Sequence, residues 1–163
     1  INAYQSYLFN SWLSKRIEIS KLIDAFEPKE IYQKLNLPLE VVKRMKKQKH
    51  PFKIMTGDLL SHYPFGKIFT IEDLETESLK FYERDRVPTG LLSGKRVKNS
   101  EGLAYEIEKE FEEDINEDGA RRFAWIFPEE LESNYKEDKN WIELQFYLPK
   151  GSYATEVIAE IIH

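Results

Sequence analysis

A strand, a tight turn and a helix are predicted by one stretch, Trp141-Ile-Glu-Leu-Gln-Phe-Tyr-Leu-Pro-Lys-Gly-Ser-Tyr-Ala-Thr-Glu-Val-Ile-Ala-Glu-Ile-Ile162. In its first part, apolar residues alternate with polar or aromatic ones, the period of two that places one face of a strand against a core. Pro149 stops the strand because it lacks a backbone N–H, and Ser152 is a suitable N-cap for a helix. The positions expected to face the core are Ile142, Leu144, Phe146 and Leu148.

The predicted helix carries apolar residues at the spacing of one buried face, namely Ala154, Val157, Ile158, Ile161 and Ile162. Tyr153 lies off this face in the first turn, close to free backbone N–H groups and to Lys150. Its ring could therefore face an anion or a nucleobase. The alternative, which these residues alone favour, is that Tyr153 packs on the rim of its own domain.

The composition of the 163 residues excludes several classes of protein. A net charge of −5 argues against a protein that coats nucleic acid indiscriminately, and leaves room only for local basic patches. The lack of cysteine removes disulfides and thiolate metal sites, and it suits the cytoplasm, which we predict as the location. No apolar run approaches the length that spans a membrane. Because the sequence opens on Ile1 within an amphipathic pattern, we expect it to be part of a longer protein.

Four helices are expected in the earlier part of the chain. Residues 1–17 and 101–115 carry apolar stripes at helical spacing, and a third such stripe follows Pro38. Thr70-Ile-Glu-Asp73 predicts a capping box that opens a helix reaching about Arg84. The polar residues of the first helix are expected mainly to face solvent; they are Asn2, Gln5, Ser6 and Asn10.

Strands and loops are expected between these helices. Residues 52–69 predict strands around a turn at Gly57-Asp58, and residues 123–127 predict another strand. Residues 87–96 predict a loop, and Pro128 a short polar helix or loop. The loop is not a nucleotide-binding P-loop, since its glycine spacing is wrong and Arg96 stands where Ser or Thr would hold magnesium.

Basic residues gather in two places in an otherwise acidic chain. The run Lys43, Arg44, Lys46, Lys47, Lys49 and Lys53 is either a phosphate contact or a solvated helix face. Arg121 and Arg122, beside a predicted strand, are either an ion-pair anchor, which is slightly favoured, or a clamp on a nucleic-acid backbone.

Self-contained catalytic machinery is not evident. The three histidines, His50, His62 and His163, are scattered, so the sequence predicts no histidine metal site. Acidic pairs such as Glu129-Glu130 lie in polar surroundings that would not tune them for acid–base catalysis. The residues alone therefore indicate an α/β domain with a suggestive corner at Tyr153.

Three blocks follow one another along the chain. The first is Ala3-Tyr-Gln-Ser-Tyr-Leu-Phe-Asn10 followed by Arg16-Ile17; the second is Gly57-Asp58, Pro88-Thr-Gly-Leu-Leu-Ser-Gly94 and Ala104-x-Glu106; the third is Ala120-Arg121-Arg122, Pro128, Phe146-Tyr-Leu-Pro-Lys-Gly-Ser-Tyr-Ala-Thr155 and Glu160. In content and order these blocks resemble the later part of the TruD family of tRNA pseudouridine synthases. The last block is the most specific.

The resemblance implies an isomerase that converts a uridine of tRNA to pseudouridine without metal or organic cofactor. Because the base must leave its ribose, rotate and rejoin through carbon, it is extruded from its stack into a pocket. An aromatic residue in the family's Gly-Ser-aromatic-Ala-Thr motif lines that pocket, and this position is Tyr153. The family's nucleophile is an aspartate in a Gly-x-Lys-Asp-Lys motif.

This sequence departs from the family pattern at several positions. The nucleophile motif is absent from the 163 residues, so the resemblance implies that it lies upstream of Ile1 and that this chain alone is inactive. Ala159 stands where the family often has arginine, directly before Glu160. The positive charge of that arginine is therefore missing here, and its role in this chain is in doubt. Leu91 and Ser93 replace prolines, a change expected to alter only the stiffness of the loop.

The resemblance also implies an organisation: residues 1–126 would be most of the family's insertion domain and residues 127–163 the C-terminal part of the catalytic domain, in a monomer whose partner is tRNA and that uses no metal or membrane. The expected contacts to the RNA backbone are Lys43, Arg44, Lys46, Lys47, Lys49, Lys53, Lys95, Arg96, Arg121, Arg122 and Lys150. The alternative is a non-catalytic RNA-binding or interaction module of the same fold.

Overall fold

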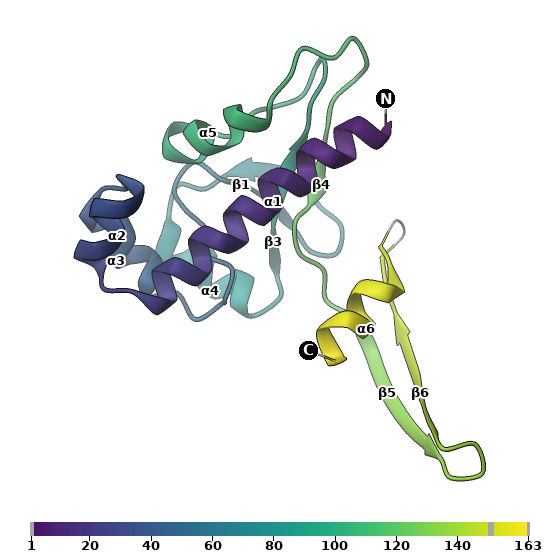
Figure 1. Cartoon of the computed structure of the whole chain (residues 1–163). Helices are drawn as coiled ribbons and strands as arrows, with labels where there is room; N and C mark the ends of the chain where they lie inside the picture. The colour runs from purple at the N-terminus through teal and green to yellow at the C-terminus, as the bar shows by residue number, and fades with distance from the viewer. Residues whose placement is uncertain (1, 150–151, 163) are drawn as a thin grey trace. The chain divides into compact units, whose positions relative to one another are not determined.

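The computed structural model describes residues 2–149 and 152–162 as helices and antiparallel sheets (Figure 1), which confirms the expected mixed α/β class. The chain divides into two compact units, unit 1 (Ile1–Ala124) and unit 2 (Trp125–His163). Unit 1 contains α1 (Asn2–Ala25), α2 (Pro28–Leu35), α3 (Leu39–Lys46), β1 (Leu59–His62), β2 (Ile68–Thr70), α4 (Leu74–Tyr82), β3 (Arg86–Leu92), α5 (Gly102–Glu108), the short 3-10 helix η1 (Lys109–Phe111) and β4 (Ala120–Phe123). Unit 2 contains β5 (Glu129–Lys136), β6 (Trp141–Tyr147) and α6 (Ala154–Ile162).

The long helix α1 organises unit 1, as Figure 1 shows. Its inward residues, including Phe9, Trp12, Ile19 and Ile23, form the core together with residues of α2, α3 and α5. Behind it lies a four-stranded antiparallel sheet in the order β2-β1-β3-β4. The prediction of a helix over 1–17 is therefore confirmed from Asn2 onward, residue 1 lying outside the described residues, and the helix continues to Ala25.

Helix α1 lies unusually close to strand β3, and Gly90 makes this approach possible. A Cβ atom added at Gly90 would lie 2.3 Å from Cζ3 of Trp12 and 2.7 Å from Cε2 of Phe9. No side chain fits between the strand and these two rings. The predicted loop over 87–96 is thus wrong: most of it is a central strand, in which the Pro-Thr-Gly sequence serves packing rather than turning.

Gly90→Ala is expected to destabilise the protein by about 1–3 kcal/mol, because the added methyl group overpacks the interface with α1. Thermal unfolding of the variant and the wild type measures the effect. Shrinking the facing ring with Trp12→Phe should make the Gly90→Ala penalty smaller in the double variant than in the wild type. An unchanged melting temperature for Gly90→Ala would contradict the close approach.

Several predicted boundaries differ from the structure. Helix α4 is confirmed, but its cap is Asp73, whose carboxylate accepts the N–H of Thr76, whereas Thr70 ends β2. The turn at Gly57-Asp58 is confirmed, and the later strand expected near residue 69 is confirmed as β2; the first strand, however, lies after the turn, at 59–62, rather than before it. The predicted helix over 101–115 ends with η1 at Phe111, and the strand predicted at 123–127 lies at 120–123.

Unit 2 is a β-hairpin followed by a helix. The strand predicted from Trp141 is confirmed as β6, and its partner β5 replaces the polar helix or loop predicted after Pro128. Helix α6 begins at Ala154, so Tyr153 rather than Ser152 precedes it directly. The predicted alternation is present in β6, where Leu144 and Phe146 are half-buried between exposed neighbours. Full burial is not reached: none of the residues described after Ala124 is buried, and Ile142, Ile158 and Ile162 are 66%, 40% and 73% exposed.

Candidate functional site

Tyr153 lies at the corner between β6 and α6, where its side chain is 72% exposed. The carbonyl oxygen of Tyr153 accepts the backbone N–H of Glu156, and the N–H of Ser152 donates to the carbonyl of Pro149. These hydrogen bonds hold the backbone before and after Tyr153, while most of the ring is exposed to solvent. The ring is therefore largely exposed within this chain and is available to a ligand or to another part of the protein.

A buried ion pair ties the long helix to the turn after α3. The Arg16 guanidinium on α1 donates to both carboxylate oxygens of Asp58, at 2.6 and 2.7 Å, and to the carbonyl of Lys53 at 3.1 Å. The side chains of Arg16 and Asp58 are only 1% and 6% exposed. Asp58 also accepts the N–H of Met55 at 2.8 Å. These two residues therefore build the scaffold and offer no charge to a ligand.

A second buried ion pair holds the central strands against α5. Arg121 on β4 lies 2.7 Å from Glu108, with side chains 3% and 2% exposed, and it donates to the carbonyl of Thr89 on β3 at 2.7 Å. Burial lowers the pKa of the Arg121 guanidinium, and the Glu108 carboxylate opposes that shift. Glu108 also accepts the hydroxyl of Ser100 at 2.6 Å. Arg121 is thus an ion-pair anchor, and we do not propose it as a phosphate contact.

The basic run on and after α3 is mostly on the surface but partly occupied. Arg44 makes a two-pronged contact to Glu75, Lys43 pairs with Glu40, and Lys49 lies 5.4 Å from the ring of Tyr82. Lys46 donates to the carbonyl of Phe26, whereas Lys47 is exposed. These surface ion pairs are weak and exchange readily for other partners.

Lys53 differs from the other members of that run because it is buried, at 3% exposure. Its ammonium donates to the carbonyls of Gln48 and His50 at 2.9 and 3.0 Å and pairs with Asp24 at 2.9 Å. All three donor hydrogens are thereby used within the fold. We therefore do not propose Lys53 as a phosphate contact.

The remaining predicted basic contacts lie at the other end of α1. Lys95 donates to Asn116, Arg96 pairs with Asp118, and Arg122 lies 5.2 Å from the ring of Phe9 and donates to Ser6. The start of α1 reaches this region through Gln5, which is buried rather than solvated and donates to the carbonyls of Ser93 and Asp118. The 24 residues of α1 span about 36 Å, so the two basic groups do not form one patch. Lys150 lies outside the described residues.

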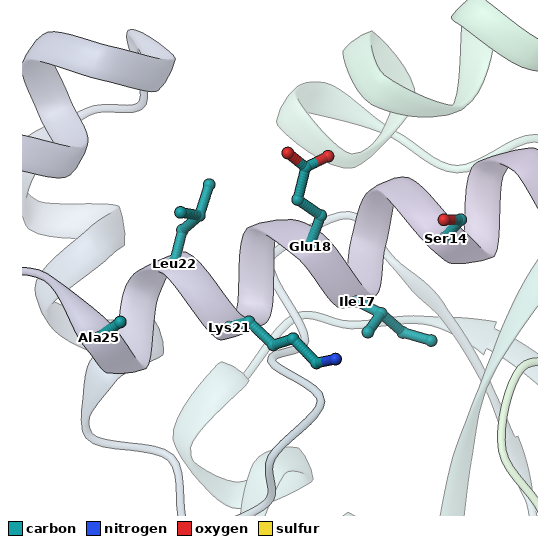
Figure 2. Close-up of a pocket in the computed structure, with 6 residues that line it drawn as sticks. All are labelled: Ser14, Ile17, Glu18, Lys21, Leu22 and Ala25. Carbon is teal, nitrogen blue, oxygen red and sulfur yellow. The ribbon is translucent and has the colours of Figure 1, made fainter.

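Figure 2 shows an open hollow on the outward side of α1. It is lined by Ser14, Ile17, Glu18, Lys21, Leu22 and Ala25. The Glu18 carboxylate and the Lys21 ammonium project to opposite sides of the helix, so the hollow does not bring an acid and a base together. No group of three or more His, Asp or Glu side chains within 2–149 and 152–162 is arranged to hold a metal ion, and no helix there could cross a membrane.

The sequence did not reveal the acidic residues that pair with the buried side chains of Arg16 and Arg121. Asp58 lies 42 residues from Arg16, and Glu108 lies on a helix whose outer face is acidic. Periodicity carries no signal for such distant pairs. The only available signal was that Arg16, Asp58 and Arg121 each fall within one of the three blocks that resemble a known family.

Comparison with known proteins gives a consistent result. The family model described as tRNA pseudouridine synthase D (TruD) matches residues 1–161. Proteins named tRNA pseudouridine synthase D from Nitratiruptor sp. and Wolinella succinogenes are each 53% identical to this chain, covering 100% of it and 46% of their own length. The protein of that name from Sulfurimonas denitrificans is 51% identical, covering 99% of this chain and 45% of its own length. The chain spans about half the length of these curated relatives.

Proposed function

The chain belongs to the tRNA pseudouridine synthase D (TruD) family, and on that premise we propose that it forms part of an enzyme that isomerises a uridine of tRNA to pseudouridine. The observation that carries the proposal is the match of the family model across residues 1–161, together with relatives of that name at about half identity over the whole chain. The proposed setting is a cytoplasmic monomer that uses no cofactor.

The proposed reaction breaks the bond between N1 of uracil and C1′ of the ribose and joins C5 to C1′. The C5 hydrogen is released as a proton and N1 takes up a proton, so the product is an isomer of the substrate. A base inside folded RNA must be extruded before this exchange. We assign Tyr153 to the uridine pocket, where its exposed ring would stack on the extruded base. The nucleophilic aspartate is assigned to a segment outside these residues, so residues 1–163 alone would be inactive.

We propose that residues 1–126 are most of an insertion domain and that residues 127–163 complete a catalytic domain. In support, α6 carries an apolar face that is only partly buried, with Ile158 and Ile161 40% and 50% exposed. A two-stranded hairpin with one helix and no buried residue is not expected to be stable by itself. We propose that catalytic-domain residues outside this chain pack against the apolar face of α6.

The proposed function is tested with the intact protein and unmodified tRNA transcripts labelled with tritium at C5 of uridine. Each conversion releases one C5 hydrogen to solvent, so released tritium counts turnovers. We expect release with at least one tRNA, without added metal or cofactor. Tight tRNA binding with no tritium release from any transcript would instead favour the alternative, a non-catalytic RNA-binding module of the same fold.

The exposed lysines of α3 and its C-terminal end are proposed to contact tRNA phosphates. Replacing both Lys43 and Lys47 with Gln should weaken tRNA binding and reduce the slope of log affinity against log salt by about 1–2, since each lost phosphate contact releases fewer counterions. Affinity measured over a range of salt concentrations gives this slope. The matched control replaces Lys21 and Lys109, two exposed lysines on α1 and η1, and should leave the slope unchanged. Equal slopes for the two double variants would remove the α3 lysines from the RNA interface.

A further inference from the structure

The loop between β1 and β2 exposes an aromatic ring to which no role has been assigned above. Phe65, at the tip of this loop, is 88% exposed, more than any other large hydrophobic side chain that the structure describes. Its neighbours Pro64, Gly66 and Lys67 are also exposed. A phenyl ring in this position is wholly available to a partner.

The loop backbone is fixed on the β1 side. The single hydrogen of the buried Ser61 hydroxyl is shared between the carbonyl of His62, at 3.0 Å, and that of Gly66, at 3.3 Å, which links the two sides of the loop. A Cβ atom added at Gly66 would lie 2.4 Å from Cβ of His62, so the turn is tighter than another residue would allow. The exposure of Phe65 therefore follows from a defined turn held by several contacts.

Tyr63 anchors the loop to the neighbouring strands. Its N–H donates to the carbonyl of Asp85 at 3.0 Å, and its ring lies 6.1 Å from that of Phe123 on β4. One aromatic residue of the loop is thus used for packing, while Phe65, two residues later, is left outside. A ring held on a fixed turn loses little conformational entropy when it binds.

The loop itself carries a basic side chain and no acidic one, which suits an anionic partner. Residues 59–71 contain no Asp or Glu, although the whole chain has 29 of them and a net charge of −5. Lys67 and His62 are both exposed beside the tip, and Asp85 borders the loop through its backbone contact to Tyr63. A single ring beside a lysine is much smaller than the apolar core of a stable protein–protein interface.

We propose that Phe65 stacks on an unpaired base of the bound tRNA and that Lys67 contacts the adjoining phosphate. This inference rests on the proposed function, since it requires that the protein binds tRNA. Unpaired bases of folded RNA are commonly held by stacking on exposed aromatic rings, and stacking accepts any base because each has a π-face. The loop would thereby add a second aromatic contact to RNA besides the one assigned to Tyr153.

The test measures tRNA affinity of the intact protein with Phe65→Ala, over a range of salt concentrations. We expect binding to weaken about 5- to 100-fold, as the loss of one base–aromatic stack predicts. The weakening should be the same factor at every salt concentration, whereas Lys67→Gln should lower the salt slope by about 1. Phe65→Trp should retain wild-type affinity. The matched control, Tyr32→Ala, removes an aromatic side chain that is 50% exposed on α2, and should leave affinity unchanged.

Two results would overturn the inference. One is an affinity for Phe65→Ala within twofold of the wild type. The other is a clear fall in melting temperature for Phe65→Ala, because the ring would then pack against protein in the intact molecule. If the wild type forms pseudouridine while Phe65→Ala binds tRNA normally, only this inference fails. If the wild type neither binds tRNA nor forms pseudouridine, the proposed function fails with it.

Discussion

Asp58→Ala is expected to lower the melting temperature of the protein by about 10–20 °C, corresponding to a loss of about 3–5 kcal/mol in the free energy of unfolding. The substitution leaves the Arg16 guanidinium buried without its anionic partner and removes the acceptor of the Met55 N–H. The rings of Trp12 and Phe52, 5.6 and 5.3 Å from the guanidinium, do not replace a carboxylate. Thermal and denaturant unfolding followed by circular dichroism measure the loss.

Two controls separate this burial effect from a general effect of charge removal. Glu75→Ala removes an acid from the exposed pair with Arg44 and should leave the melting temperature nearly unchanged, because water and salt screen that pair. Combining Asp58→Ala with Arg16→Met should recover part of the lost stability, since the double variant buries no unpaired charge. Equal effects of Asp58→Ala and Glu75→Ala would refute the structural role assigned to the buried pair.

The helices of unit 1 were largely predictable because their signals are local. The stripe of α3 places Val42 and Met45 inward, and both are buried as the helical period predicts. Helix α4 was found from residues that favour capping, although the cap moved from Thr70 to Asp73 because Thr70 is already paired in β2. Local propensity gives the element, and tertiary pairing then decides its first residue.

The strands were less predictable because their partners are distant in sequence. Strand β3 contains Pro88 and Gly90, which favour a turn in isolation, yet β1 and β4 pair with it on both sides and α1 packs on Gly90. Strand β5 is polar except for Leu131 and Tyr135, shows no apolar alternation, and is a strand through its pairing with β6. Neither outcome is encoded in the periodicity of the segment itself.

The candidate site shows the same limit. The basic run at 43–53 was visible as composition, but only the fold reveals that Lys53 is buried between two carbonyls and Asp24 and that Arg44 meets Glu75. Phe65 had no sequence signal, since a single aromatic residue in a turn resembles any core residue until its exposure is known. Tyr153, in contrast, was singled out by its place between a strand and a helix and lies exposed there.

Tyr153→Ala is expected to lower kcat/KM for pseudouridine formation by about 10- to 100-fold, because the extruded uracil loses the ring on which it stacks. Tyr153→Phe keeps the ring and should stay within about threefold of the wild type, since stacking does not need the hydroxyl group. Because the side chain is 72% exposed in this chain, the alanine variant is not expected to disturb the fold of unit 1. Tyr135→Ala is the matched control, removing a tyrosine that is 55% exposed on β5 of the same unit.

The most direct test of the account is the rate of tritium release from C5-labelled tRNA in a single turnover, with the intact protein and these three variants. We expect rapid release with the wild type, Tyr153→Phe and Tyr135→Ala, and slow release with Tyr153→Ala although tRNA is still bound. Release at the wild-type rate by Tyr153→Ala would contradict the assignment of this ring to the uridine pocket.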